Sequence, residues 1–196
     1  MSVVYTIGHS NHPWEVFAAM LKDHRIDVVV DIRSAPYSRF APQFDHGILQ
    51  KKLAEGEIKH LYLGAELGGR PKGPQYYDNQ GHVLYGRMTA DHEFQAGIDR
   101  LERGIAGYRV ALLCGEEDPA HCHRRLLVGR VLVERGHELL HIRADGRLES
   151  EAQLTAESGK HLVEEQPALF AELEEDQWRS TASVSPKKAP ANSSAH

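Results

Sequence analysis

The chain has 196 residues and a formal net charge of −5, with 41% hydrophobic and 26% charged residues. This length predicts one domain whose core is large enough to fold without disulfide bonds. The two cysteines exclude the disulfide framework of small secreted proteins and favour a cytoplasmic location. We expect no contact with a membrane, because no apolar run approaches about 18 residues and the N-terminus has no signal-peptide pattern.

Acidic residues are concentrated towards the C-terminus. Residues 1–150 carry 19 basic and 20 acidic side chains, whereas residues 151–178 carry one and eight. Residues 179–196 carry three basic side chains and consist mainly of Ser, Ala, Pro and Lys. We therefore predict an α/β domain over residues 1–150, an acidic extension over residues 151–178 with a helix near residues 162–173, and a disordered tail over residues 179–196. The nearly neutral domain lacks the net basic charge that non-specific nucleic-acid binding requires.

Short apolar runs alternate with amphipathic segments along the first 150 residues. The apolar runs predict five strands, over residues 3–7, 27–32, 59–63, 108–114 and 138–142. Apolar side chains at helical spacing predict four helices, over residues 13–21, 48–55, 94–105 and 126–135. This alternation predicts a single Rossmann-like α/β domain, with a mostly parallel sheet of about five strands and helices on both faces.

Two long segments show no periodicity. Residues 33–47 contain two prolines, Arg39 and several aromatic side chains, and residues 64–88 are rich in Gly, Pro and Tyr. A structureless connection of the second length is uncommon, so we interpret it as a lid or a binding loop. Arginine beside aromatic residues can stack on a nucleobase, although such residues more often pack a loop against its domain.

Polar side chains follow the predicted strands. His9 and Ser10 follow the first strand, Asp31 and Arg33 end the second, and Glu116 follows the fourth. Because parallel strands end at one edge of a sheet, where α/β proteins bind ligands, we expect these residues to line one pocket. His9, Asp31 and Glu116 are the candidate groups for proton transfer. Asp31 has the alternative role of accepting backbone N–H groups at a strand end.

The segment after the fourth strand holds both cysteines. We predict Cys122 in the first turn of a helix that Asp118 caps and Pro119 starts, where the helix N-terminus and His123 favour the thiolate. Cys122 is therefore the candidate nucleophile, and His123 is a further candidate for proton transfer. The alternative is a Cys122 that packs as a small apolar residue. Cys114 ends an apolar strand, so we expect it in the core.

Arginines near the strand ends are candidates for anion binding. Arg33, Arg39 and Arg124, together with the hydroxyl of Ser10, have the chemistry to hold a phosphate or carboxylate. We expect Arg125 on the solvated face of its helix instead.

No metal site is predicted, and the sequence identifies no cofactor. The spacing of Cys114, His121, Cys122 and His123 matches neither the Cys-x2-Cys nor the His-x3–5-His pattern of zinc sites. A metal bound by these residues remains the alternative.

Four short motifs occur in order along the domain. They are Thr6-Ile7-Gly8-His9-Ser10, then Asp31-Ile32-Arg33 with Pro36 and Ser38, then Leu67-Gly68-Gly69, and finally Leu113-Cys114-Gly115-Glu116 followed by Pro119 and Cys122-His123-Arg124. Over roughly residues 3–145 the chain thereby resembles the family catalogued as domain of unknown function 488. The resemblance implies a compact, Rossmann-like α/β domain found in prokaryotes, without an established reaction. The segment Leu84-Tyr85-Gly86-Arg87-Met88 is a looser match to a further motif of that family.

The favoured hypothesis is a small cytoplasmic enzyme that acts on an anionic, nucleotide-like small molecule. Cys122 or Glu116 would be the reactive group, while His9 and His123 would transfer protons. Arg33 and Arg124 would hold the anion. The alternative is a non-catalytic module that binds a transition metal or nucleic acid. Neither hypothesis implies a particular oligomeric state.

Overall fold

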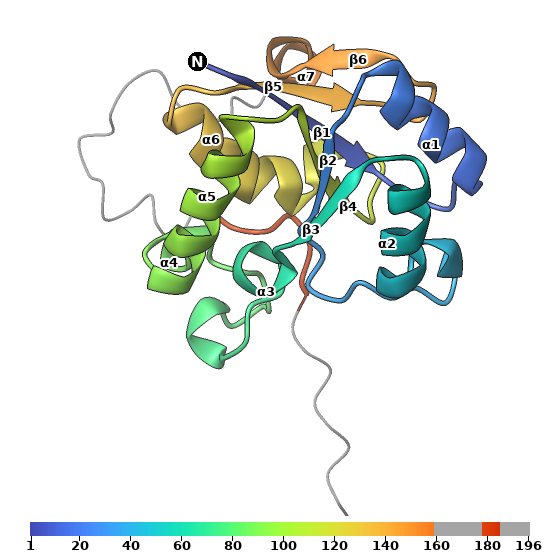
Figure 1. Cartoon of the computed structure of the whole chain (residues 1–196). Helices are drawn as coiled ribbons and strands as arrows, with labels where there is room; N and C mark the ends of the chain where they lie inside the picture. Colours follow the sequence, from blue (N-terminus) through green and yellow to red (C-terminus); the bar gives the residue numbers. More distant parts are fainter. Residues whose placement is uncertain (159–177, 185–196) are drawn as a thin grey trace, which may run out of the picture.

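The computed structural model describes residues 1–158 and 178–184, which form a central sheet with helices on both sides (Figure 1). The strands are β1 (Val3–Gly8), β2 (Val28–Asp31), β3 (Lys59–Tyr62), β4 (Val110–Cys114), β5 (Glu138–Ile142) and β6 (Leu148–Ser150). The α-helices are α1 (Trp14–Asp23), α2 (His46–Glu55), α3 (Gly64–Leu67), α4 (Tyr85–Thr89), α5 (His92–Ile105), α6 (Arg130–Glu134) and α7 (Glu151–Ser158). Three short 3-10 helices are η1 (Pro42–Phe44), η2 (Pro74–Tyr76) and η3 (Pro119–His121), and a π-helical stretch, η4 (Arg124–Gly129), precedes α6.

The sheet has six strands in the order β3-β2-β4-β1-β5-β6. The first five strands are parallel to their neighbours, and β6 pairs antiparallel with β5. The predicted α/β fold with a mostly parallel sheet is therefore confirmed, with one additional strand. The strand order also differs from the 3-2-1-4-5-6 order of the dinucleotide-binding fold, because β4 lies between β2 and β1.

Each face of the sheet has its own hydrophobic core. Along β2, the side chain of Val29 packs with Phe17 of α1 and Leu49 of α2, whereas Val30 packs on the other face with Ile98 of α5. Figure 1 shows α1 and α2 on one side of the sheet and α4, α5 and α6 on the other. Strands covered on both faces need apolar residues at successive positions, which explains the continuous apolar runs of β2 and β4.

The chain leaves the neighbouring strands β1 and β4 in opposite directions. From β1 it crosses one face of the sheet through α1 to reach β2, and from β4 it crosses the other face through η4 and α6 to reach β5. Where two adjacent parallel strands connect in opposite directions, a crevice opens beyond their carboxyl ends. The fold therefore places the residues after β1 and β4 around one crevice.

Gly8 brings the two strand ends together. It is the last residue of β1, and a β-carbon built on it would clash with the backbone carbonyl of Glu116. We expect Gly8→Ala to lower the free energy of unfolding by about 2 kcal/mol or more, because the methyl group would displace the backbone after β4. Urea unfolding measures the change. Gly104→Ala in α5 is the control: its β-carbon meets nothing within 4 Å, so it should stabilise the protein by about 0.5–1 kcal/mol. Equal stabilities of the two variants would contradict the close contact.

The described part of the C-terminal region packs against the domain. In α7, Leu154 is buried and Glu151 forms an ion pair with Arg125. Further along, the indole N–H of Trp178 donates to the carbonyl of Leu126 at 2.6 Å, and the backbone of residues 178–184 pairs with residues 81–85. Residues 179–184 therefore differ from the disorder expected of the tail. The helix predicted near residues 162–173 and the remaining tail, residues 185–196, lie outside the described residues.

Within residues 1–158 and 178–184, no helix combines the length and the apolar character that crossing a membrane requires.

Candidate functional site

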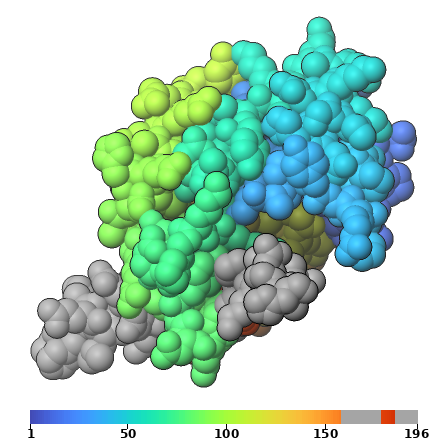
Figure 2. Space-filling model, turned by 90° about the horizontal axis from the view of Figure 1, so that it is seen from below, coloured from blue at the N-terminus to red at the C-terminus, as the bar shows by residue number. Residues whose placement is uncertain are grey.

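A cavity of about 450 Å³ opens beyond the carboxyl ends of β1, β2 and β4. Figure 2 views this face of the molecule, where the light-blue segment after β2 and the green segment after β3 stand on either side of a hollow. Seven of the residues singled out in the sequence line the cavity: His9, Ser10, Arg33, Cys114, Glu116, His121 and His123. Of the five strand-end residues expected to line one pocket, the structure brings His9, Ser10, Arg33 and Glu116 to this cavity and leaves Asp31 outside the lining.

Other predicted site residues lie outside the lining. Cys122 and Asp31 are fully buried, and Arg39 is exposed beside the ring of Phe40. Arg124 is also fully buried, and its guanidinium donates to the carbonyls of Glu116 and Glu117 and, at 3.3 Å, to the hydroxyl of Thr6. Because these three oxygens occupy the guanidinium, Arg124 holds the loop after β4. It does not face an anion in the cavity.

Arg125 was expected on a solvated helix face, and that expectation was wrong. Its side chain is buried, and its guanidinium forms two-pronged hydrogen bonds with the carboxylate of Glu151. The physical reason is the packing of α7 over this part of the domain, which the sequence of the helix itself does not reveal.

Asp31 fixes the position of Arg33. The Asp31 carboxylate accepts from Nε of Arg33 at 2.8 Å, from Nη2 at 2.7 Å and from the Arg33 backbone N–H at 3.1 Å. Burial alone would raise the pKa of Asp31, but the hydrogen bonds from Arg33 outweigh it and lower this pKa to about 2. Asp31 is therefore ionised at neutral pH and acts as an anchor for Arg33. The ionised Asp31 carboxylate is unsuited to general acid catalysis.

His9 is held in one tautomer. Nη1 of Arg33 donates to Nε2 of His9 at 3.0 Å, so the proton of a neutral ring is on Nδ1, which donates to the carbonyl of Ser10 at 2.7 Å. The ring stacks on Phe44 with centroids 4.6 Å apart. Burial lowers the pKa of His9, which favours this neutral form. Both ring nitrogens are occupied, so His9 orients Arg33 and has no free nitrogen for proton transfer.

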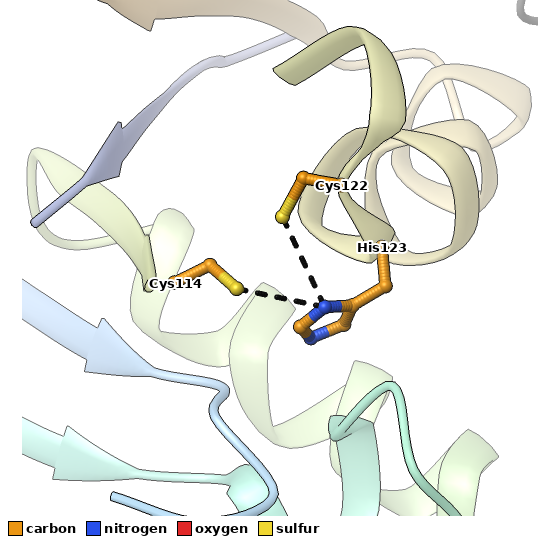
Figure 3. Close-up of side chains that lie close together, drawn as sticks. All are labelled: Cys114, Cys122 and His123. Carbon is orange, nitrogen blue, oxygen red and sulfur yellow. Dashed lines mark hydrogen bonds between the residues drawn. The ribbon is translucent and has the colours of Figure 1, made fainter. Parts of the chain in front are cut away.

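Cys114, Cys122 and His123 form a compact group at the end of β4 (Figure 3). Nδ1 of His123 lies 3.6 Å from Sγ of Cys114 and 4.0 Å from Sγ of Cys122. The other ring nitrogen, Nε2, donates to the carbonyl of Ile32 at 3.0 Å. This bond directs Nδ1 towards the two sulfurs. We name these three residues the Cys-Cys-His cluster.

The electrostatics of this cluster separate the two thiols. A hydrogen bond from Cys122 and the nearby His123 ring lower the pKa of Cys114 despite its burial. Burial and the neighbouring Cys114 raise the pKa of Cys122. Burial would lower the pKa of His123, but Cys114 raises it above the ordinary value. The arrangement favours a Cys114 thiolate beside a protonated His123, with Cys122 as a thiol that donates to Cys114.

Both cysteines are buried, Cys114 as expected at the end of an apolar strand and Cys122 in agreement with its alternative packing role. Cys114 nevertheless contributes to the cavity lining, whereas Cys122 does not. As predicted, Asp118 caps a helix that starts at Pro119, and its carboxylate accepts from the backbone N–H of Ala120 at 2.9 Å. That helix is η3, which ends at His121, so Cys122 has extended backbone between two helices and its side chain turns inwards.

Sequence reasoning missed several cavity residues. Arg70 comes from the loop after α3, and its backbone N–H donates to the hydroxyl of Ser34 at 2.9 Å. Gly69 allows this loop to approach, because a β-carbon there would lie 2.6 Å from Cγ of His123. The pair Gly68-Gly69 directly before Arg70 was the sequence signal that could have indicated this loop. Residues 180–184 also contribute to the wall, and no local pattern in the tail indicated that.

A second group of possible metal ligands includes Asp31. Ligand atoms of Asp31, His46 and His60 are within 4.8 Å of one another, and Nε2 of His60 is 3.8 Å from Oδ2 of Asp31. The same Oδ2 already accepts from Arg33. The guanidinium charge disfavours a second cation there, so the Cys-Cys-His cluster is the better candidate for holding a metal.

The family model described as "Domain of unknown function DUF488" matches residues 13–131. No curated protein and no solved structure matched the chain.

Proposed function

Since the chain belongs to the domain of unknown function 488 family, whose description names no reaction, we propose its function from the site itself. We propose a cytoplasmic enzyme that acts on an anionic, nucleotide-like small molecule bound in the cavity. The observation that carries this proposal is the combination, in one cavity, of Cys114 and His123 with arginines and exposed aromatic rings. A crevice at the carboxyl ends of parallel strands is also the feature that supports a Rossmann-like description of the domain.

Arginines supply the anion-binding character. Arg33 lines the cavity and is held by Asp31, Phe44 and His9, which use four of its five N–H groups. An arginine fixed in this way loses little side-chain freedom when it binds a ligand. Arg70 lines the same cavity and is exposed. Together they favour a phosphate or carboxylate over a neutral ligand.

Aromatic rings at the rim support the nucleotide-like part of the proposal. Tyr37 and Phe40 line the cavity, yet 69% and 87% of their surfaces are exposed. Exposed aromatic rings beside an anion site provide the stacking surface that a nucleobase uses. Arg39, placed in the binding set by its sequence, lies over the ring of Phe40 at 6.0 Å and can contribute to that stacking surface.

The reactive end of the cavity is formed by Cys114, His123 and Glu116. Cys114 takes the place that the sequence assigned to Cys122, because Cys114 belongs to the lining and Cys122 does not. Glu116 is exposed in the same wall and is the carboxylate available for proton transfer. His9 and Asp31 act through Arg33 and are positioning residues.

Binding of nucleoside monophosphates tests the proposal. We expect at least one of AMP, GMP, CMP and UMP to raise the melting temperature and to bind in isothermal titration. Arg70→Ala should weaken that binding about tenfold or more, because a charge-assisted phosphate contact contributes about 1.5–3 kcal/mol. Phe40→Ala should weaken it by a similar factor through loss of stacking, worth about 1–3 kcal/mol per base.

Matched controls keep this test specific. Arg147→Ala and Tyr108→Ala remove an exposed arginine and an exposed aromatic ring outside the cavity, so they should leave nucleotide affinity unchanged. If the protein binds inorganic phosphate and shows no preference for a nucleotide, the anion site stands and the part of the proposal that assigns a nucleobase is wrong. No binding of any of these anions, or equal losses in Arg70→Ala and Arg147→Ala, would overturn the proposal.

A further inference from the structure

We propose that Cys114, Cys122 and His123 bind one zinc ion, with a remaining coordination position that faces the cavity. The inference rests on the proposed function, because it assigns the reactive centre at the same end of that cavity. It goes beyond that function by identifying an ion as the reactive group.

The distances within the Cys-Cys-His cluster fit a tetrahedral ion. With bonds of about 2.3 Å to sulfur and about 2.0–2.1 Å to nitrogen, tetrahedral zinc holds its ligands about 3.6–3.8 Å apart. The observed separations from Nδ1 of His123 are 3.6 and 4.0 Å, and all three ligand atoms lie within 4.8 Å of one another. The side chains could close around an ion by moving a few tenths of an ångström up to about 1 Å.

The surroundings of His123 match those of a metal-bound imidazole. Metal-ligating histidines donate the other ring N–H to a carbonyl or carboxylate, which fixes the tautomer and aims the lone pair at the ion. Nε2 of His123 donates in this way to the carbonyl of Ile32. Gly69 packs against the ring, so the imidazole has little freedom to turn away.

The donor set selects the kind of ion. Two thiolates and one imidazole are soft or borderline ligands, which favour zinc over magnesium or calcium. Three protein ligands with an open fourth position are typical of catalytic zinc sites, whereas structural sites have four protein ligands. Cys114 and His123 line the cavity, whereas Cys122 is outside the lining and fully buried. The open position therefore faces the ligand-binding space.

The chain departs from common zinc motifs because its ligands come from two elements. Cys114 ends β4, whereas Cys122 and His123 lie just before η4, on the far side of the loop that follows the strand. The fold brings the end of β4 close to the start of η4, so the ligands can meet without a short motif such as Cys-x2-Cys. A zinc ion here would supply an activated water at neutral pH, and Glu116, a carboxylate in the same cavity wall, is the candidate group to accept its proton.

Metal content and cobalt spectroscopy test the site without an activity assay. Protein produced without an affinity tag, in zinc-supplemented medium, should contain about one zinc per chain by elemental analysis. After removal of zinc with a chelator, added Co2+ should give the intense visible bands and the sulfur-to-cobalt charge-transfer band of a tetrahedral thiolate site. Cys122→Ser and His123→Gln should each lower zinc content at least about fivefold, because each removes one of three ligands.

Two histidine variants serve as controls. His121→Gln changes an exposed neighbour of the cluster, and His60→Gln removes a member of the second group of possible ligands, so both should retain zinc. If a cluster variant fails to fold, the cobalt spectrum of the wild-type protein still decides the question, because sulfur-to-cobalt bands require thiolate ligands.

The outcomes separate this inference from the proposed function. Less than about 0.2 zinc per chain together with no thiolate–cobalt bands would overturn the metal site, and so would zinc that is lost in His60→Gln but retained in His123→Gln. Nucleotide binding that persists in such a metal-free protein would leave the proposed function standing, with Cys114 as the reactive group. Zinc at about one per chain without binding of any nucleotide would support the metal site alone.

Discussion

Replacing Asp31 with asparagine is expected to lower the free energy of unfolding at pH 7 by about 3 kcal/mol. The substituted side chain would keep the shape of the carboxyl group but remove the charge that the buried Arg33 guanidinium needs. The cost is high because the variant leaves a buried guanidinium cation without its partner. The measurement is urea unfolding followed by tryptophan fluorescence.

The effect of Asp31→Asn should depend on pH in a defined direction. The pKa of Asp31 is about 2 in the folded protein and 3.8 in its ordinary state. A lowered folded pKa contributes stability that is present in full above about pH 4 and is lost as the pH falls towards 2. The difference between wild type and variant should therefore be constant from pH 7 to 5 and should shrink by about 2 kcal/mol between pH 4 and 2.

Asp145→Asn is the matched control for this substitution. Asp145 pairs with Arg147, but both side chains are more than half exposed, so solvent screens the pair and its loss should cost less than about 0.5 kcal/mol. A cost for Asp31→Asn no larger than that of the control, or one that grows below pH 4, would falsify the role assigned to the Asp31–Arg33 pair.

Arg124→Met is expected to destabilise the protein by about 3 kcal/mol. The substitution retains most of the buried volume but leaves the carbonyls of Glu116 and Glu117 without their donor. Hydrogen bonds to a charged group contribute about 1.5–3 kcal/mol each, and the gain in apolar packing offsets part of the loss. Arg124→Lys should recover only part of the stability, since one ammonium group does not reproduce the fork of the guanidinium.

The readout for Arg124 includes the loop as well as the whole fold. Backbone amides of residues 115–118 should exchange with deuterium faster in Arg124→Met, because the guanidinium no longer ties the loop to β1 through Thr6. Arg103→Met, at an exposed position of α5, should change neither stability beyond about 0.5 kcal/mol nor exchange in the loop. Unchanged exchange in Arg124→Met would show that other contacts hold the loop.

The sheet could be predicted from the sequence because its strands are marked by continuous apolar runs. β2 and β4 are buried at every position, so their residues have the pattern of strands covered on both faces. β6 has only three residues and α3 only four, which is too short for any periodicity to be visible. The short helices within residues 64–88 were missed for the same reason.

The candidate site was predictable as far as topology determined it. Parallel strands bring His9, Arg33 and Cys114 to one edge of the sheet whatever the orientation of their side chains. The sequence shows which residues follow each strand. The orientation of individual side chains was not predictable. Whether Cys114 or Cys122 faces the cavity depends on where η3 ends, and the burial of Arg124 depends on carbonyls that only the folded loop presents.

The position of β4 between β1 and β2 has a consequence for the order of events during synthesis. Tyr5 of β1 pairs with Ala111 of β4, and Val3 pairs with Glu138 of β5, so β1 waits during synthesis for partners that are made much later. Such non-local pairing slows folding and leaves the edges of β1 open in nascent chains. The cavity, which spans the ends of β1 and β4, cannot exist in an N-terminal fragment that stops before β4. A small molecule that binds in this cavity can therefore stabilise only a chain that has already completed most of its sheet.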